Sequence, residues 1–362
     1  MRIVYLADAP YIHTTRWVQH FARLGHDLHV VSFRPAEIEG ATVHHVGGFE
    51  PLRKLRYLVH ARRVAAVIRR LRPDLLHALH LTSYGFLGAL TGVKPYVISV
   101  WGTDVLEAPT RTPLHRFLTN YGLAKADAIT ATGLRLAEAT LPYVERGKGV
   151  TVVPYGVDLE RFTPEPRVEK PRVTVGATSR FSPEKGLPHL LRATAMLRDR
   201  GVDIDVVLAG EGPSQRRLEQ LTRQLGLEDR VRFPGWLQHN SLPGLLQQYD
   251  IFTMPSTKEG FGVSAVEASA MELPVVASRV HGIPDVVIDG ETGILVPPAD
   301  ERALAAAIER LVRDAELRRR MGCAGRAFVE RNYRWQDNTA LMERLYEEMT
   351  GVRPPVRTAS GN

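Results

Sequence analysis

The chain has 362 residues, of which 44% are hydrophobic and 24% charged, the composition of an ordinary globular protein. Its single cysteine, Cys323, excludes an intramolecular disulfide framework and any cysteine-cluster metal site. The length predicts two domains, and the net charge of +7 favours an anionic partner such as a phosphorylated metabolite, an anionic lipid or nucleic acid.

The first half of the sequence alternates short apolar runs with amphipathic stretches. Strands are predicted over residues 2–7, 27–33, 74–79, 95–102 and 127–132. A helix is predicted over 16–25, which ends at a glycine, and this alternation indicates a parallel, doubly wound α/β sheet. The first apolar run meets Asp8 too soon for a signal peptide, and no run is long enough to span a membrane, so we expect a cytoplasmic protein.

A change of composition separates the two halves. Residues 153–166 contain Pro164 and Pro166, which are poor helix and strand formers, so we expect the interdomain linker there. The strand pattern then restarts at residues 172–179, 203–213, 231–236, 250–256 and 273–278. The predicted parts are a first domain over 1–160, a second over 161–335, a helix over 336–350 that returns to the first domain, and a tail over 351–362.

Residues 256–267 join a predicted strand to a predicted helix. Glu259, Gly260, Phe261 and Gly262 are expected to form a tight turn, in which the glycines permit close backbone approach to a ligand. The N–H groups of the first helical turn then favour a diphosphate. Glu267 lies eight residues after Glu259, and each carboxylate can accept two hydroxyl hydrogen bonds from a sugar or ribose. Taken alone, this spacing also fits a helix-start acid followed by a solvated one.

The residues around this pair resemble glycosyltransferase family 4. Residues 255–268 match the family's P-S-x-x-E-G-F/x-G-x-x-x-x-E-A frame, and residues 176–186 resemble its G-R-x-x-x-x-K-G element. Three further segments resemble the family in the same order, namely residues 153–162, 209–213 and 281–297. Tyr155 stands where asparagine is commoner, and His281 replaces a glycine. The resemblance before these segments is limited to architecture and weaker motifs.

The resemblance implies a GT-B fold, in which two Rossmann-like, doubly wound domains face a central cleft. It also implies that Arg180 and Lys185 hold the donor diphosphate, where fixed cations stabilise the charge of a departing nucleotide. Glu259 would contact the transferred sugar, and Glu267 would accept hydrogen bonds from the ribose. The other donor-binding candidates are Gly260, Phe261, Gly262, Val263, Gly210 and Glu211.

Four further candidates and one catalytic candidate lie in the first half. The Ser-Val-Trp-Gly-Thr-Asp segment that ends at Asp104 resembles the family's H-G-x-D loop, with Trp101 where many members have histidine. Asp104 is retained as a catalytic candidate. His80 ends a predicted strand, where a lone histidine is often structural. His13 and Thr14 are expected in the loop after the first strand, which lacks the glycine pair of many members. We expect Trp101 and His80 to contact the acceptor or to line the cleft, and His13 and Thr14 to do the same or to contact the donor phosphate instead.

Asp203 and Asp205 spell the D-x-D pattern that some glycosyltransferases use to bind a divalent metal. Because an apolar strand follows directly, we interpret both acids as caps of a strand entrance. The resemblance implies metal-independent chemistry, so we predict no metal site and no cofactor.

The strongly basic segment 52–72 has two interpretations. With Leu55, Leu58, Val59, Ala65 and Ile68 as an apolar stripe, it could attach peripherally to an anionic bilayer at the inner face of the membrane, where each cation contributes about 1 kcal/mol. We favour the other interpretation, a surface helix packed on its own sheet. No recognition motif accompanies the charge, so no nucleic-acid partner is expected.

These observations predict a glycosyltransferase of the hexosyltransferase type. It would move a sugar from a UDP- or GDP-sugar, a co-substrate rather than a cofactor, to a hydroxyl acceptor such as a sugar or a lipid-linked sugar. Retention at the anomeric carbon and a role in cell-envelope polysaccharide or glycolipid synthesis are expected from the resemblance. Two alternatives stay open, a nucleotide-sugar epimerase on the same fold and a non-catalytic GT-B binding module.

Overall fold

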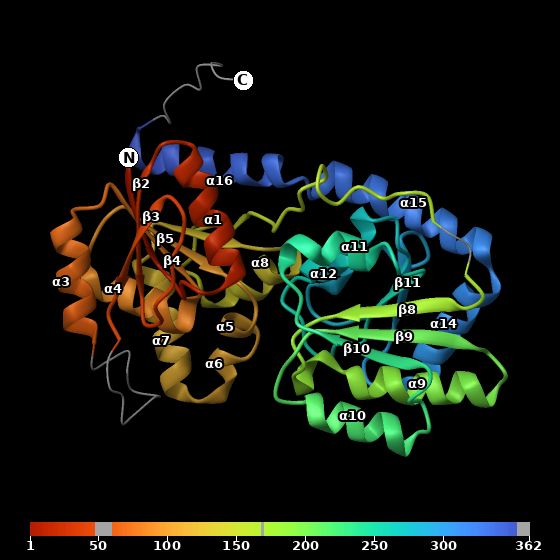
Figure 1. The fold of residues 1–362 in the computed structure, drawn as a ribbon. Helices are drawn as coiled ribbons and strands as arrows, with labels where there is room; N and C mark the ends of the chain where they lie inside the picture. The colour runs from red at the N-terminus through yellow and green to blue at the C-terminus, as the bar shows by residue number, and fades with distance from the viewer. Residues whose placement is uncertain (48–59, 168–169, 353–362) are drawn as a thin grey trace. The chain divides into compact units, whose positions relative to one another are not determined.

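The computed structural model describes residues 1–47, 60–167 and 170–352, and the chain divides into two compact units (Figure 1). The first unit comprises Met1–Pro154 and Thr339–Asn362, and the second comprises Tyr155–Asn338. Each unit has its own parallel sheet with helices between the strands, which is an α/β architecture.

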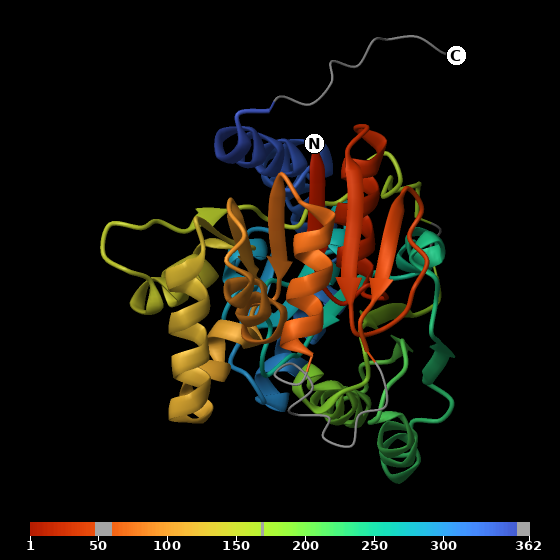
Figure 2. The ribbon, with the colours of Figure 1, turned by 90° about the vertical axis from the view of Figure 1, so that its left-hand side faces the viewer.

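In the first unit, seven described strands form one sheet in the order β3-β2-β1-β4-β5-β6-β7, and all neighbouring pairs are parallel (Figure 2). The strands are β1 (Arg2–Leu6), β2 (Asp27–Ser32), β3 (Ala41–His45), β4 (Leu75–Leu79), β5 (Tyr96–Val100), β6 (Ala128–Ala131) and β7 (Thr151–Val152). Every residue of β4 and β5 is buried, as expected of central strands that helices cover on both faces.

The helices of this unit lie between the strands. They are α1 (Ile12–Arg23), α3 (Ala61–Leu71), α4 (Phe86–Thr91), α5 (Thr103–Leu106), α6 (Ala108–Arg111), α7 (Pro113–Lys125) and α8 (Leu134–Thr140). The amphipathic pattern of α3 directs Val64 and Ile68 into the core, while its arginines stay outside.

The last helix, α16 (Trp335–Thr350), joins the first unit from Thr339 onward through a buried hydrogen-bonded chain. The hydroxyl groups of Tyr346 and Tyr5 are 3.1 Å apart, and the Tyr346 hydroxyl also bonds to Nδ1 of His77 in β4. Nε2 of His77 lies 2.7 Å from Oγ of Ser99, which continues to Oγ1 of Thr130 at 2.6 Å. Burial lowers the pKa of His77 to about 3, so these hydrogen-bonded side chains are uncharged at physiological pH.

The second unit contains a six-stranded parallel sheet in the order β10-β9-β8-β11-β12-β13. The strands are β8 (Val173–Thr178), β9 (Ile204–Ala209), β10 (Val231–Gly235), β11 (Ile251–Met254), β12 (Val275–Ser278) and β13 (Gly293–Val296). The helices are α9 (Leu187–Asp199), α10 (Gln215–Gln224), α11 (Leu242–Leu246), α12 (Val263–Ala270), α13 (Ile283–Val286), α14 (Glu301–Arg313) and α15 (Ala315–Asn332).

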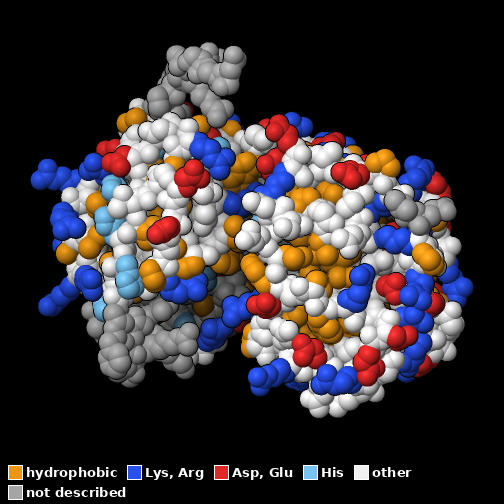
Figure 3. Space-filling view, in the orientation of Figure 1, with side chains coloured by type: hydrophobic (Ala, Val, Ile, Leu, Met, Phe, Trp, Pro, Cys, Tyr) orange, Lys and Arg blue, Asp and Glu red, His pale blue; other side chains and the backbone are white. Residues whose placement is uncertain are grey.

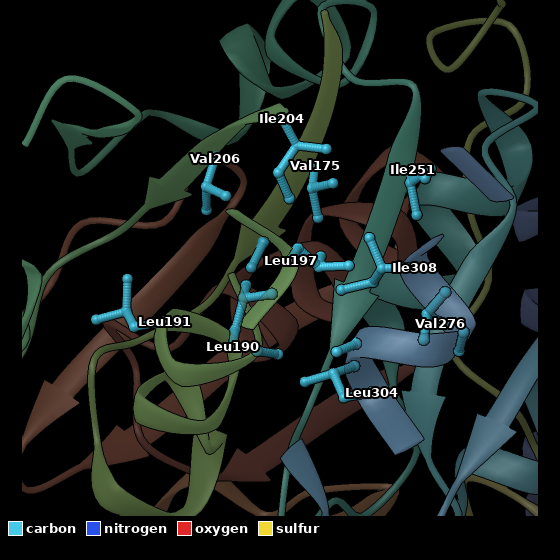
Figure 4. Packing of buried hydrophobic residues seen from close by; sticks show 14 of the residues in the cluster. Val175, Leu190, Leu191, Leu197, Ile204, Val206, Ile251, Val276, Leu304 and Ile308 are labelled. Atoms are coloured by element: carbon cyan, nitrogen blue, oxygen red, sulfur yellow. The ribbon is translucent and has the colours of Figure 1, made fainter. Parts of the chain in front are cut away.

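Branched side chains from these strands interlock with leucines of α9 and α14 to form the core of the second unit (Figure 4). Val175, Leu190 and Ile308, for example, are fully buried within it. This packing fixes the strands, so the loops at their carboxyl ends keep a defined geometry.

The strand order reverses once in each sheet, between β1 and β4 in the first and between β8 and β11 in the second. Such a switch point opens a crevice at the carboxyl ends of the strands, where ligands of doubly wound sheets bind. Arg180 and Lys185 follow β8 and Glu259 follows β11, while His13 follows β1 and His80 follows β4, so predicted site residues lie beside both positions.

The structure differs from the sequence predictions at several elements. Strands β3, β7 and β13 were not predicted: β3 is half-exposed at the sheet edge, β7 has two residues, and β13 lies inside a loop-rich motif. Helix α1 begins at Ile12 rather than at residue 16, so the predicted loop position of His13 and Thr14 is wrong, because both lie in the first turn of this helix.

Candidate active site

The loop after β8 carries the two predicted phosphate-binding cations. Arg180 is exposed, and its side chain makes no hydrogen bond or ion pair within the described parts of the chain. Lys185 ends a short 3-10 turn and is followed by Gly186, whose φ of 65° is left-handed. A Cβ atom at Gly186 would lie 1.9 Å from the carbonyl oxygen of Pro255, so only glycine lets this loop approach the loop after β11 so closely.

Lys185 and Glu259 join these two loops. Nζ of Lys185 donates to Oε2 of Glu259 at 2.6 Å, and the two side chains are 23% and 16% exposed. The backbone N–H of Thr257 donates to the carbonyl oxygen of Glu184 at 2.8 Å and reinforces the junction. The predicted diphosphate cation and the predicted sugar-contacting acid therefore form one ion pair at the switch point of the second sheet.

Glu267 lies on the buried side of α12 and is only 5% exposed. Nε2 of His239, in a short turn before α11, donates to Oε1 of Glu267 at 2.8 Å. The sequence analysis did not identify His239, because nothing in its own surroundings indicates a partner 28 residues away. The histidine therefore fixes the orientation of the carboxylate, and no bond to the other oxygen is seen among the described residues.

The turn before α12 is shaped by its glycines and anchored by one aromatic ring. Gly262 has a φ of 101° and caps the helix, whose first N–H groups have no helical partner. Gly282 approaches the turn so closely that a Cβ atom there would lie 2.2 Å from the carbonyl oxygen of Gly260. Phe261 is 3% exposed and packs against other rings of the second unit, so it holds the turn in place, and Val263 begins α12 directly after the turn.

The loop after β9 contributes Gly210 and Glu211. Gly210 has a φ of 135°, and a Cβ atom there would lie 1.9 Å from the carbonyl oxygen of Ser179, so this loop lies directly against the loop of Arg180. The Glu211 carboxylate accepts a hydrogen bond from the backbone N–H of Trp236 at 3.3 Å. Trp236 follows β10 and is 64% exposed, which makes it a further residue at this edge that the sequence analysis missed.

Asp203 and Asp205 precede or begin β9 and are held by arginines. Arg172 lies 3.6 Å from Asp203 and 3.1 Å from Asp205, and Arg230 lies 3.0 Å from Asp203. These ion pairs agree with the interpretation of both acids as part of a strand entrance. Within the described residues, no cluster of three or more histidine, cysteine, aspartate or glutamate side chains has the geometry of a metal site.

Asp104 in the first unit is completely buried. Its carboxylate accepts hydrogen bonds from the backbone N–H groups of Gly102 at 2.8 Å, Leu81 at 3.0 Å and Trp101 at 3.2 Å. These bonds tie together the loops after β4 and β5. The geometry is that of a carboxylate that organises backbone rather than one that reaches a substrate.

The remaining candidates of the first unit follow β1, β4 and β5. His80 directly follows β4 with a φ of 83°, an unusual conformation for a residue with a Cβ atom, and its Nδ1 lies 3.3 Å from Oγ of Ser83. Thr14 is completely buried. His13 and Trp101 are half-buried, and their ring centroids are 6.2 Å apart.

The basic segment 52–72 is only partly described, since residues 52–59 lie outside the described residues. From Ala61 onward it is α3, which buries Val64 and Ile68, whereas Leu55, Leu58 and Val59 of the predicted stripe are not described. Arginines stand out at the edge of the first unit where α3 lies (Figure 3). None of the helices within the described residues combines the length and apolar character that crossing a bilayer requires.

Comparisons with known proteins match both halves of the chain. Residues 160–328 match the family model described as glycosyl transferases group 1, and residues 2–133 match the model described as glycosyl transferase 4-like. The GDP-mannose-dependent alpha-(1-6)-phosphatidylinositol monomannoside mannosyltransferase of Mycolicibacterium smegmatis is 32% identical over 299 residues, which cover 76% of this chain and 75% of that protein.

Two solved structures have a similar fold along almost the whole chain. Sucrose-phosphate synthase of Thermosynechococcus elongatus superposes with a TM-score of 0.85 at 23% identity, over 97% of this chain and 99% of that one. The HepE protein of Anabaena in complex with UDP-glucose gives a TM-score of 0.80 at 21% identity, over 95% and 99%. At these identities the likeness concerns the fold.

Proposed function

We propose that this chain, which belongs to the glycosyl transferases group 1 family, moves a sugar from a UDP- or GDP-sugar to a hydroxyl of a sugar or lipid-linked sugar, with retention. The chain has a GT-B fold and is a nucleotide-sugar-dependent glycosyltransferase. The observation that supports the donor site is the 2.6 Å Lys185–Glu259 pair at the switch point of the second sheet. The transferase names of the relatives favour transfer over the epimerase alternative.

In the proposed reaction, the bond between the anomeric carbon and the diphosphate oxygen breaks, and the leaving diphosphate gains negative charge. Arg180 and Lys185 stabilise this charge together with the first N–H groups of α12. Arg180 approaches the diphosphate without first giving up an ion pair, whereas Lys185 must share its charge with Glu259. The acceptor hydroxyl attacks from the face that the diphosphate leaves, and its proton goes to the leaving oxygen, so that the configuration is retained.

The two acids have different partners, which supports different roles. Glu267, oriented by His239, accepts hydrogen bonds from the ribose hydroxyls, and these bonds exist before and during the reaction. Glu259, held against Lys185, contacts the transferred sugar where positive charge develops. The backbone of residues 260–263 binds the sugar and phosphate oxygens.

We extend the proposal to two properties, metal independence and a cytoplasmic location. The ion pairs of Asp203 and Asp205 with Arg172 support the first, because these acids already have a cationic partner. Attachment of α3 to an anionic membrane surface is the alternative to a surface helix packed on its own sheet; the arginines of α3 face outward, whereas Val64 and Ile68 are buried in the core. Transfer that continues in excess chelator is the expected result for the first property, and binding to phosphatidylglycerol vesicles that salt reverses would support the membrane alternative.

The experiment for the main proposal measures nucleotide release and product formation together. The full chain is incubated with a panel of UDP- and GDP-sugars, with and without methyl glycosides as hydroxyl acceptors. We expect free nucleotide and a new glycosidic bond in equal amounts with one donor. An interconverted nucleotide sugar without nucleotide release would support the epimerase alternative. Nucleotide binding without turnover of any donor would support the binding module.

A further inference from the structure

Three aromatic rings meet at the carboxyl edge of the first sheet. Tyr11 precedes α1, His13 lies in its first turn, and Trp101 follows β5. The ring centroids are 5.2 Å apart for Tyr11 and His13, 5.6 Å for Tyr11 and Trp101, and 6.2 Å for His13 and Trp101. Each ring therefore contacts both of the others, although the chain separates Trp101 from the other two by about 90 residues. We call this cluster the aromatic platform.

Asp104 anchors the loop that carries Trp101, one of the three rings of the platform. The carboxylate of this completely buried residue accepts hydrogen bonds from the backbone N–H groups of Trp101 and Gly102, and also from Leu81 after β4. Gly102 has a φ of 141°, which residues with a Cβ atom rarely adopt, so the loop that presents Trp101 depends on this glycine. A ring on a fixed loop loses little conformational freedom when it binds a ligand.

The platform lies where the first sheet would bind a ligand. Its residues follow β1 and β5, which flank β4, and the strand order reverses between β1 and β4. The strained His80, with a φ of 83°, ends β4 at the same edge, and strain of this kind concentrates at functional sites. Tyr11 keeps 43% of its surface exposed, so part of the platform is open to a ligand.

The chemistry of the rings indicates the kind of ligand. Aromatic faces are electron-rich, while the C–H groups on one face of a pyranose ring are weak hydrogen-bond donors, so the two surfaces attract each other. Tyr11 and Trp101 also carry polar edges, a hydroxyl group and an indole N–H, of the kind that can bond to ring hydroxyls. An acyl chain would use the faces but not these edges, and a phosphate would use neither face.

We propose that Tyr11, His13 and Trp101 form a platform that binds the sugar ring of the acceptor. The inference rests on the proposed glycosyl transfer and narrows its acceptor to one whose attacked hydroxyl belongs to a sugar ring. Many family members have histidine at the position of Trp101, and the proposal assigns the tryptophan to acceptor recognition. Asp104 is then a positioning residue rather than a catalytic one.

Saturation-transfer NMR on the full chain tests the platform. The probes are methyl α-D-mannopyranoside and methyl α-D-glucopyranoside, which report ring protons in contact with the protein. Wild-type protein should give ring-proton signals with at least one probe, and Trp101→Ala and Tyr11→Ala should reduce them about fivefold. Trp101→Phe, which keeps a ring, should retain most of the signal. Phe117→Ala removes a 59% exposed ring elsewhere in the first unit and should change nothing.

Calorimetry with UDP and GDP separates this proposal from the proposed function. Nucleotide affinity should be equal in wild type, Trp101→Ala and Tyr11→Ala, and if turnover is found, the KM for the acceptor should rise in both variants. Unchanged sugar signals in both variants, absence of ring-proton signals in the wild type, or a loss confined to donor affinity would overturn the platform. Sugar binding that depends on the platform, together with a failure of every donor to react, would contradict the proposed function alone.

Discussion

The two sheets reverse their strand order at equivalent positions but carry different chemistry there. At the switch point of the second sheet, Arg180 is unpaired among the described residues, and Lys185 and Glu259 form an ion pair between neighbouring loops. Near the switch point of the first sheet, Trp101 belongs to an aromatic cluster, and the buried Asp104 carboxylate accepts hydrogen bonds from backbone N–H groups. In the proposed enzyme, topology places each ligand at a switch point, and the loop side chains decide whether that position suits a diphosphate or a sugar ring.

The largest expected effect concerns the cations of the second sheet. Arg180→Ala and Lys185→Ala should each raise the barrier to transfer by roughly 2–4 kcal/mol, because each removes a fixed charge from the leaving diphosphate. Initial rates measure the effect, and denaturant unfolding should show little change in stability. Arg192→Ala removes a 44% exposed arginine of the same unit and serves as the control. Wild-type turnover in the double variant would remove the basis for a charged donor site.

The next effect distinguishes the two acids of the same site. Glu259→Gln should mainly lower kcat, by about 100-fold, because its contact strengthens in the transition state. Glu267→Gln should mainly weaken nucleotide binding, and His239→Ala should weaken it in the same way to a smaller extent, since His239 orients Glu267. Calorimetry with the product nucleotide, measured beside initial rates, separates these results. If both glutamine variants bind nucleotide and turn over normally, the E-x₇-E match is a coincidence.

A change at Asp104, in the first unit, should affect stability rather than nucleotide binding. Asp104→Ala leaves three backbone N–H groups without their acceptor, two of them buried, and should lower the free energy of unfolding by about 2 kcal/mol. UDP and GDP affinity should stay unchanged, in contrast to Glu267→Gln. Asp203→Asn, at a residue with a 52% exposed side chain, should cost far less stability. A stable Asp104→Ala variant that has lost turnover would instead restore Asp104 as a catalytic residue.

The smallest expected effect concerns the neutral chain of Tyr5, His77 and Tyr346. Burial lowers the pKa of His77 to about 3, so His77 stays neutral in the folded state while it takes up a proton below about pH 6.5 when unfolded. The free energy of unfolding should therefore decrease as the pH is lowered, by about 1 kcal/mol from pH 7 to pH 5.5.

His77→Asn keeps polar atoms at this position but cannot titrate, so this part of the pH dependence should disappear in the variant. Denaturant unfolding of both proteins at the two pH values measures the difference. An equal loss of stability in wild type and variant would show that other groups cause it.

Much of the fold followed from local patterns in the sequence. The apolar runs of the central strands are fully buried in β4 and β5, and such runs leave little choice of secondary structure. Edge strands such as β3 escaped prediction because half-exposed residues give no such run. The position of α12 was also predicted, from the glycine-containing turn over residues 259–262 that precedes it.

What the sequence alone determined is the alternation of the buried strands with helices, the glycine-containing turn before α12, and the family frame around Glu259 and Glu267. Only the tertiary structure decided the partners: Lys185 with Glu259, His239 with Glu267, Asp104 with the backbone, and Trp101 with Tyr11. The reason is physical. Local periodicity depends on neighbours within a few residues, whereas each of the side-chain pairs joins segments that are distant in the sequence and come together only when helices cross between parallel strands and return the chain to the same sheet edge.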